Sequence, residues 1–289
     1  MRSTLVLLLS ICSFSVFGQV HSFDYAYSND KGICVYSSAN KQETVVAKNG
    51  DNPCISPDGT KLAYTVLSKN GDRTIGVIDL GTKQKTLLNT NSHNCYGPFW
   101  SPDAKYIAYN VFNAQKSTWS IAVIPAGNGS AKVLTGKLAQ CYMPTWTNDD
   151  KVVVQDMDSL FVFALSGNIA ASYTISTMAK TDGAGSSDRF IFTGDGKKIV
   201  FSSEVNEPGF DGPPNAVFVY DIASKSNIRL TPKGYYAADI WLKAGKLLFS
   251  GGKIKSKVIN VYTVDLDGKN LKILFANCSN ISAKSQAAN

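Results

Sequence analysis

Gly97-Pro-Phe-Trp-Ser-Pro-Asp-Ala-Lys-Tyr-Ile-Ala-Tyr109 is the clearest of several related stretches that recur along the chain at a nearly constant interval. The others are Asn52-Pro-Cys-Ile-Ser-Pro-Asp-Gly-Thr-Lys-Leu-Ala-Tyr64, Met143–Val154, Arg189–Phe201 and the more divergent Asp239–Phe249. The residues that open the turns are Ser56, Ser101, Thr147, Thr193 and Leu242, at intervals of 45, 46, 46 and 49 residues. Such a period is typical of repeat architectures, whereas a β-sandwich repeats no motif at fixed spacing.

Each repeat contains the signals of four strands. Ser-Pro-Asp-Gly is a tight turn, because Pro presets φ, Asp bonds nearby backbone and Gly accepts a positive φ. Apolar stretches flank this turn and predict a hairpin. A third strand follows, as in Thr74–Asp79 or Ala216–Asp221, and a fourth follows in four of the five units, as in Lys85–Leu88. Four antiparallel strands in about 45 residues is the pattern of a propeller blade.

The two ends of the chain complete one further blade. Residues 23–48 carry matches to the second, third and fourth strands of the unit, and the first strand is missing. Residues 278–286 can supply it, which would join the termini and leave no open sheet edge around the ring. We therefore predict an all-β, six-bladed β-propeller closed by N- and C-terminal strands that share one blade. Five blades with an irregular N-terminal cap are the alternative.

The pattern Trp-Ser-Pro-Asp-Gly-x-x-Ile-Ala-Tyr resembles the PD40, or WD40-like, repeat of TolB-like β-propellers. Trp100-Ser-Pro-Asp103 with Ile107-Ala-Tyr109 is the best match, and the resemblance covers about residues 23–280. The resemblance implies the fold more strongly than a function, because the same repeats occur in Tol components, oligopeptidases and pectin-degrading lyases. TolB carries an additional α/β domain before its propeller, and residues 1–22 are too few to hold one.

The N-terminus predicts export. Arg2 precedes an apolar run from Leu5 to Phe17, and Val16-Phe-Gly18 fits a cleavage site before Gln19, which is the pattern of a secretory signal peptide. We therefore expect a signal peptide at 1–18, a single propeller domain at 19–289, and a periplasmic or secreted location. No later segment is long and apolar enough for a transmembrane helix.

Charge and histidine content limit the chemistry. The formal net charge is +7, but no Lys/Arg run exceeds two residues, which argues against nucleic acid as a partner. The chain has two histidines, His21 and His93, so a catalytic triad would have to use His93 and a His-rich metal site is excluded. No Gly-x-Ser-x-Gly or C-x-x-C motif occurs. We predict no catalytic residues, no cofactor and no metal.

The most informative short stretches are His93-Asn-Cys-Tyr96 and Gln140-Cys-Tyr142, which occupy equivalent places in neighbouring units. Cys95 and Cys141 are interpreted as small buried residues, with a disulfide or a soft-metal pair as alternatives. Loops that enter an inner strand share one face with loops between second and third strands, and long loops on a rigid scaffold often bind ligands. The predicted binding residues on this face are His93, Asn94, Tyr96, Gln140, Tyr142, Asp182, Asp188, Arg189, Tyr235, Tyr236 and Asp239.

These observations favour a non-enzymatic binding or scaffold propeller that recognises a protein, a peptide or a cell-envelope component at its loop-rich face. The alternative is a carbohydrate-active enzyme or glycan-binding propeller that uses Asp182, Asp188, Asp239 or Glu207 at the channel mouth, since glycosidases need two nearby carboxyl groups. A structural adaptor that binds neighbours through its outer blade edges is a third reading. Calcium between Asp182 and Asp188 is disfavoured, because the spacing is not that of an EF-hand loop.

Overall fold

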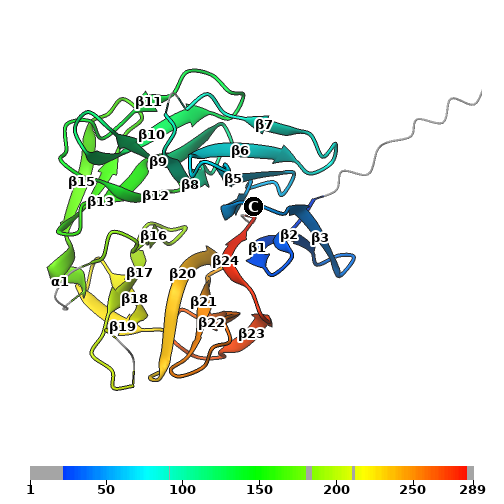
Figure 1. Cartoon of the computed structure of the whole chain (residues 1–289). Helices are drawn as coiled ribbons and strands as arrows, with labels where there is room; N and C mark the ends of the chain where they lie inside the picture. The colour runs from blue at the N-terminus through cyan, green and yellow to red at the C-terminus, as the bar shows by residue number, and fades with distance from the viewer. Residues whose placement is uncertain (1–21, 91, 180–183, 210–211, 285–289) are drawn as a thin grey trace, which may run out of the picture.

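The chain forms six four-stranded antiparallel sheets arranged as blades around a common centre, which confirms the six-bladed propeller (Figure 1). This computed structural model describes residues 22–284 except 91, 180–183 and 210–211. The expected signal peptide therefore lies outside the described residues. In the described part, no helix is long and apolar enough to cross a membrane.

The blades are numbered along the chain, and the strands of each are given from the centre outward. Blade 1 holds β24 (Ser279–Ala283), β1 (Tyr25–Asn29), β2 (Gly32–Ser37) and β3 (Gln42–Ala47). Blade 2 holds β4 (Asp51–Ile55), β5 (Lys61–Leu67), β6 (Arg73–Asp79) and β7 (Lys85–Leu87). Blade 3 holds β8 (Cys95–Trp100), β9 (Tyr106–Asn113), β10 (Thr118–Pro125) and β11 (Lys132–Val133).

The remaining blades repeat this order. Blade 4 holds β12 (Tyr142–Trp146), β13 (Val152–Gln155), β14 (Ser159–Phe163) and β15 (Ile169–Thr174). Blade 5 holds β16 (Phe190–Phe192), β17 (Lys198–Glu204), β18 (Asn215–Asp221) and β19 (Ser226–Arg229). Blade 6 holds β20 (Tyr235–Lys243), β21 (Lys246–Lys253), β22 (Asn260–Asp265) and β23 (Lys272–Phe275). The helix α1 (Ile175–Ala179) follows β15.

The ring closes as predicted, with the last strand of the chain paired to the first. Tyr25 of β1 is opposite Ala283 of β24, and Figure 1 shows β24 at the centre beside β1. The Oγ of Ser282 accepts a hydrogen bond from the backbone N–H of Ile55 in blade 2 (3.1 Å), so the strand also contacts the next blade. Closure removes the exposed inner edge that an open sheet would leave.

Hydrogen bonds of the Ser/Thr-x-Asp sequence build the turns between first and second strands. The hydroxyl of Ser56 donates to Asp58 (2.6 Å), and Ser101 makes the same bond to Asp103 (2.7 Å). Thr147 and Thr193 repeat it in blades 4 and 5. Each turn contains one residue with positive φ, which is Gly59 in blade 2, with φ 75°. These repeated carboxylates therefore serve the turns, as the sequence predicts.

Polar side chains of second strands join neighbouring blades. A β-bulge in an inner strand leaves one backbone N–H without a ladder partner. At the bulge in β8, the N–H of Gly97 donates instead to the hydroxyl of Thr65 in blade 2 (3.0 Å). At the bulge in β12, the N–H of Met143 donates to Asn110 Oδ1 (3.0 Å), while Asn110 Nδ2 donates to the Tyr96 carbonyl (3.1 Å). The inner strands are thus fixed from the side.

Blade 6 departs from the aligned repeat by one residue. Its turn contains only Ala244 and Gly245, both with positive φ (51° and 70°), as a two-residue type I′ hairpin requires. Leu242 consequently lies opposite Leu247, in the place that Trp100 occupies in blade 3. The sequence alignment placed Leu242 at the turn opening, which is wrong. A shift of one residue moves a side chain to the other face of its strand, so Trp241 does not face as Trp100 does.

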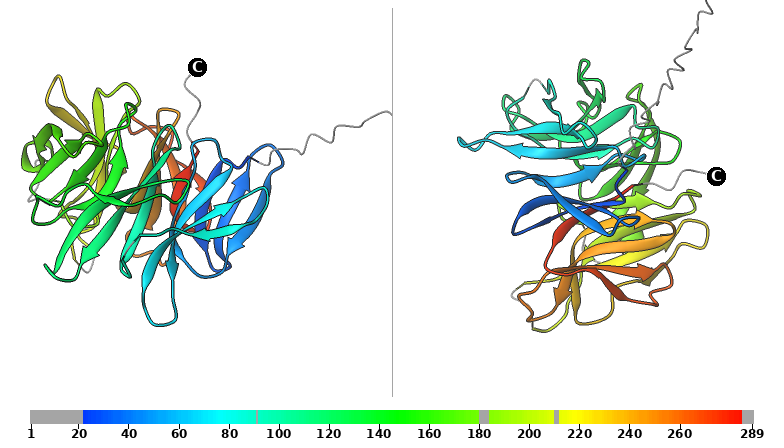
Figure 2. Two further views of the ribbon diagram at one scale, coloured as in Figure 1. Left: turned by 90° about the horizontal axis from the view of Figure 1, so that it is seen from above. Right: turned by 90° about the vertical axis from the view of Figure 1, so that its right-hand side faces the viewer.

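The two faces of the ring differ in their connections, and Figure 2 (left) shows the ring edge-on between them. We call the face with the Ser/Thr-x-Asp turns the turn face. The opposite one, the loop face, carries the segments that enter each inner strand and those between second and third strands. The two kinds of segment meet there, because Arg73 at the start of β6 donates its N–H to the His93 carbonyl (3.0 Å).

Candidate functional sites on the two faces

A cluster of aromatic rings around one arginine lies on the loop face at blades 2, 3 and 4. The guanidinium of Arg73 lies 4.5 Å from the centre of the Tyr96 ring and 5.5 Å from that of Trp119 in β10. Arg73 Nε also donates to Asn94 Oδ1 (2.9 Å). The Tyr96 and Trp119 rings meet edge to face at 5.1 Å. The strand ends of two blades thus place a cation on an aromatic platform, an arrangement that is attractive in itself.

Two further predicted residues continue this cluster toward blade 4. Gln140 Oε1 accepts hydrogen bonds from the backbone N–H of Trp119 (3.0 Å) and from the Tyr142 hydroxyl (3.1 Å). Burial raises the pKa of both Tyr96 and Tyr142, so each phenol is neutral and able to donate at neutral pH. We call the following set the rim cluster: Arg73, Asn94, Tyr96, Trp119, Gln140 and Tyr142.

His93 lies beside the rim cluster but makes few contacts. Its side chain is 93% exposed, and its Nδ1 lies 3.9 Å from a carboxylate oxygen of Asp72. A catalytic histidine must lie within hydrogen-bond reach of the group it deprotonates. No serine or cysteine side chain is hydrogen-bonded to His93 in the described part of the chain.

Asp188 is buried and supports the local structure rather than facing solvent. Its Oδ1 accepts hydrogen bonds from Ser202 Oγ (2.7 Å) and Asn215 Nδ2 (2.9 Å), and its Oδ2 accepts one from the Gly185 N–H (2.7 Å). Burial raises the pKa of this carboxyl group despite these bonds. The carboxylate therefore ties the segment before β16 to blade 5. Asp182, its predicted companion, lies outside the described residues.

Arg189 and Asp239 come together near the channel centre from blades 5 and 6. Arg189 Nε lies 3.7 Å from Asp239 Oδ1, and the guanidinium is 5.1 Å from the centre of the Phe99 ring. The Arg189 side chain is only 8% exposed. Burial raises the pKa of Asp239, and the charge of Arg189 opposes this effect. The pair is interpreted as part of the channel interior, since a buried arginine needs a compensating carboxylate.

The predicted tyrosines of blade 6 form a separate group. Tyr235 packs edge to face on Tyr262 at 5.6 Å, and the ammonium group of Lys253 lies 5.9 Å from the Tyr235 ring centre. Tyr236 follows in the same strand, opposite Gly252, and burial raises the pKa of its phenol. These tyrosines lie in blade 6, whereas the rim cluster lies at blades 2, 3 and 4, so the predicted residues are divided between at least two places on the loop face.

The five described cysteines are buried and carry free thiols, so neither the Cys95–Cys141 disulfide nor any other is present among them. Burial raises the pKa of Cys141 to about 12. The interpretation of Cys95 and Cys141 as small buried residues is therefore confirmed. Within the described residues, no group of three or more His, Cys, Asp or Glu side chains could hold a metal ion.

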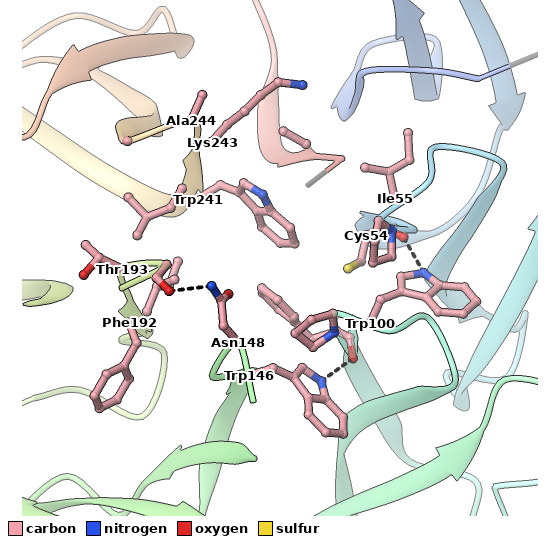
Figure 3. Close-up of a pocket in the computed structure, with 18 of the residues that line it drawn as sticks. Cys54, Ile55, Trp100, Trp146, Asn148, Phe192, Thr193, Trp241, Lys243 and Ala244 are labelled. Carbon is pink, nitrogen blue, oxygen red and sulfur yellow. Dashed lines mark hydrogen bonds between the residues drawn. The ribbon is translucent and has the colours of Figure 1, made fainter. Parts of the chain in front are cut away.

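The turn face holds a cavity that the sequence does not indicate. Its volume is about 300 Å³, and it is lined by residues of all six inner strands or the turns beside them. Trp100, Trp146 and Trp241 are among these lining residues (Figure 3). Trp100 and Trp146 donate their indole N–H to carbonyls of the preceding blade (3.0 Å each). Trp241 stacks on Phe99 of blade 3, with ring centres 4.4 Å apart and planes at 17°. Because blades 3 and 6 are opposite one another, this stack crosses the channel.

Reasoning from the sequence missed Arg73 and Trp119 on the loop face and Trp241 on the turn face. Arg73 directly precedes a predicted third strand, so its place on the loop face could have been inferred. Its stacking on Tyr96 could not, because that contact joins residues of two blades. Trp241 was aligned with Trp100, and only the pairing register reveals its different orientation.

The fold is similar to that of several solved propeller structures. TolB from Acinetobacter baumannii matches with a TM-score of 0.65 at 16% identity, covering 91% of this chain and 66% of that one. A putative TolB from Agrobacterium tumefaciens matches with a TM-score of 0.63 at 18% identity, covering 92% of this chain and 95% of that one. An oligogalacturonate lyase in complex with manganese matches at 0.53 and 11% identity, covering 84% and 70%. No protein-family model and no curated protein matches the chain. The chain is thus a TolB-like propeller in fold.

Proposed function

We propose that this chain is an exported, non-enzymatic binding module that recognises a protein, a peptide or a cell-envelope component through its loop face. The observation that carries the proposal is the rim cluster, where Arg73, Tyr96 and Trp119 from two blades form one partly exposed surface. Tyrosine, tryptophan and arginine are the residues that contribute most binding free energy in protein interfaces. The ring holds these side chains on strand ends, so little conformational entropy is lost on binding.

The state of the carboxylates supports binding over glycoside hydrolysis. A glycosidase needs two carboxyl groups that both reach the substrate. Asp188 accepts three hydrogen bonds, Asp239 is paired with Arg189, and Glu207 is paired with Arg229 and with the Gly234 N–H (2.9 Å). Each of these three candidates is thus already bound to a neighbouring group of the chain.

A second candidate function is recognition of a small ring-shaped ligand, such as a sugar, in the turn-face cavity. The specific observation is Trp241, whose indole N–H has no hydrogen-bond partner among the described residues, in contrast to Trp100 and Trp146. An aromatic face next to an available donor suits the apolar face and hydroxyl edge of a sugar ring.

Two matched variants separate these functions. Trp119→Ala removes a partly buried tryptophan from the loop face, and Trp241→Ala removes one from the turn face. The purified chain and both variants would be immobilised and exposed to cell-envelope extract, and screened in parallel by thermal shift against glycans and peptidoglycan fragments. A bound ligand raises the melting temperature by mass action.

Capture of a specific protein that is lost in Trp119→Ala and kept in Trp241→Ala supports the loop-face proposal. A glycan shift that is lost only in Trp241→Ala supports the second candidate. Retention of all binding in both variants contradicts both sites. Turnover of a polysaccharide by the purified chain contradicts the non-enzymatic proposal. Secretion of the chain, with cleavage before Gln19, tests the proposed export.

A further inference from the structure

Arg73 is held in one orientation by contacts on several sides. Its backbone N–H donates to the His93 carbonyl (3.0 Å), and its Nε donates to Asn94 Oδ1 (2.9 Å). Its guanidinium carbon lies 4.5 Å from the centre of the Tyr96 ring and 5.5 Å from the centre of the Trp119 ring. A long, flexible side chain is therefore fixed before any partner arrives, which lowers the entropy cost of binding.

The charge of Arg73 is not compensated within the described part of the chain. Arg189 pairs with Asp239 and Arg229 pairs with Glu207, whereas Arg73 has no ion pair. The carboxylate of the adjacent Asp72 instead accepts a hydrogen bond from Asn70 Nδ2 (2.9 Å) and lies 3.9 Å from His93 Nδ1. The two terminal nitrogens of Arg73 make no hydrogen bond to any described residue.

The free edge of this guanidinium has the geometry of a carboxylate receptor. Nε donates to Asn94 and the guanidinium carbon lies over the Tyr96 ring, so the two terminal nitrogens remain to donate two parallel hydrogen bonds. Carboxylates accept such a pair in a bidentate manner, and lysine cannot reproduce it. The positive net charge of the chain (+7) favours the approach of an acidic partner.

We propose that Arg73 binds a carboxylate side chain in an acidic peptide segment of the partner protein, with Tyr96 and Trp119 contacting the neighbouring residues of that segment. This inference rests on the proposed function, because it names the chemistry that the loop face selects. A peptide is favoured over an anionic glycan, because tyrosine, tryptophan and arginine together form the composition of protein-interface hot spots.

The test uses a displayed random 12-residue peptide library selected against the purified chain. Selected peptides are synthesised with each acid as such and as its amide, and their Kd values are measured for wild type, Arg73→Gln, Arg73→Lys and Lys253→Gln. Lys253→Gln removes one positive charge elsewhere on the loop face and controls for general electrostatic attraction. A heparin-derived oligosaccharide serves as the anionic glycan probe.

The proposal predicts a shared Asp or Glu among selected peptides. Changing that acid to its amide raises Kd by about tenfold or more, as expected for a charge-assisted pair. Arg73→Gln has the same effect, the two changes together add nothing further, Arg73→Lys recovers only part, and Lys253→Gln has little effect.

Several outcomes overturn the proposal. Peptides that bind equally as acid and amide, or bind Arg73→Lys as well as wild type, eliminate the bidentate carboxylate contact. If such peptides nevertheless fail to bind Trp119→Ala, the proposed loop-face function stands without the carboxylate contact. If binding of heparin depends on Arg73 and binding of no peptide does, the ligand of Arg73 is an anionic glycan and not an acidic peptide. If no peptide is selected at all, both the inference and the peptide-binding function fail.

Discussion

Replacing Asn110 tests whether polar side chains between blades hold the loop face in place. Asn110 is fully buried, and its amide both donates to the Tyr96 carbonyl and accepts from the Met143 N–H. Asn110→Ala leaves that carbonyl and that N–H without partners inside the ring. Each buried orphan costs about 1–3 kcal/mol, so we expect a loss of about 2–6 kcal/mol in the free energy of unfolding.

The loss would be measured by urea unfolding and by calorimetry. For a chain of this size, 1 kcal/mol corresponds to about 2 °C in melting temperature, so Tm should fall by about 4–12 °C. Asn110→Leu fills much of the space but restores neither hydrogen bond, and it should lose a similar amount. A large recovery in Asn110→Leu would instead assign the loss to the cavity.

Asn113→Ala is the matched control, because Asn113 makes one hydrogen bond, to the Lys116 N–H (3.0 Å), in an exposed turn. We expect it to lose at most about 1 kcal/mol. The reasoning is refuted if Asn110→Ala and Asn113→Ala lose equal amounts. Because Tyr96 belongs to the rim cluster, Asn110→Ala should also weaken loop-face binding at temperatures where the variant remains folded.

Three further predictions concern thiols, pH and ring closure. A thiol reagent should label the five described cysteines of the native chain only as fast as the fold opens, because they are buried and the pKa of Cys54 is raised to about 12; rapid labelling of any of these five in the native protein would contradict this. Hydrogen bonds from Thr193 and Lys197 lower the pKa of Asp195 below 3.8, so its contribution to stability is present above that pH and lost below it. Asp195→Asn should therefore flatten the acid limb of a stability–pH curve, and an unchanged curve argues against the bond. Deleting residues 279–289 should abolish cooperative unfolding, measured by circular dichroism, whereas deleting 285–289 leaves β24 intact; equal stability of both would refute closure by this strand.

The fold could be predicted because the signal repeats. A single turn motif is compatible with many folds. Five related stretches at near-constant spacing, with the strands of one further unit divided between the two ends of the chain, are compatible with few architectures other than a propeller. The outer strand β15 was missed because its residues are mostly exposed and alternate weakly, so its sequence carries little apolar signal. The helix α1 is too short to show a helical period.

The candidate site was harder to predict, because a side chain's role depends on what other blades bring to it. An aspartate such as Asp188 in a long loop is typical of a ligand-binding residue. In the structure, however, Ser202 and Asn215 from two strands of the same blade donate hydrogen bonds to its carboxylate. Tyr96 and Gln140 were found from their position on the loop face. Their joint contact with Trp119 depends on the packing of blade 3 against its neighbours.

The repeat itself indicates where function resides in this ring. A residue type that recurs in blade after blade, such as the Asp of the Ser/Thr-x-Asp turns, meets a requirement that every blade shares, which is structural. Specific recognition needs a surface that occurs once, so it must depend on residues that break the repeat. Arg73 is such a residue, since the equivalent register positions of blades 3 and 5 hold Trp119 and Asn215. Trp241 is another, because the shortened turn of blade 6 alone turns an indole toward Phe99. Substitutions that restore the repeat at these two positions should therefore cost binding while leaving the propeller folded.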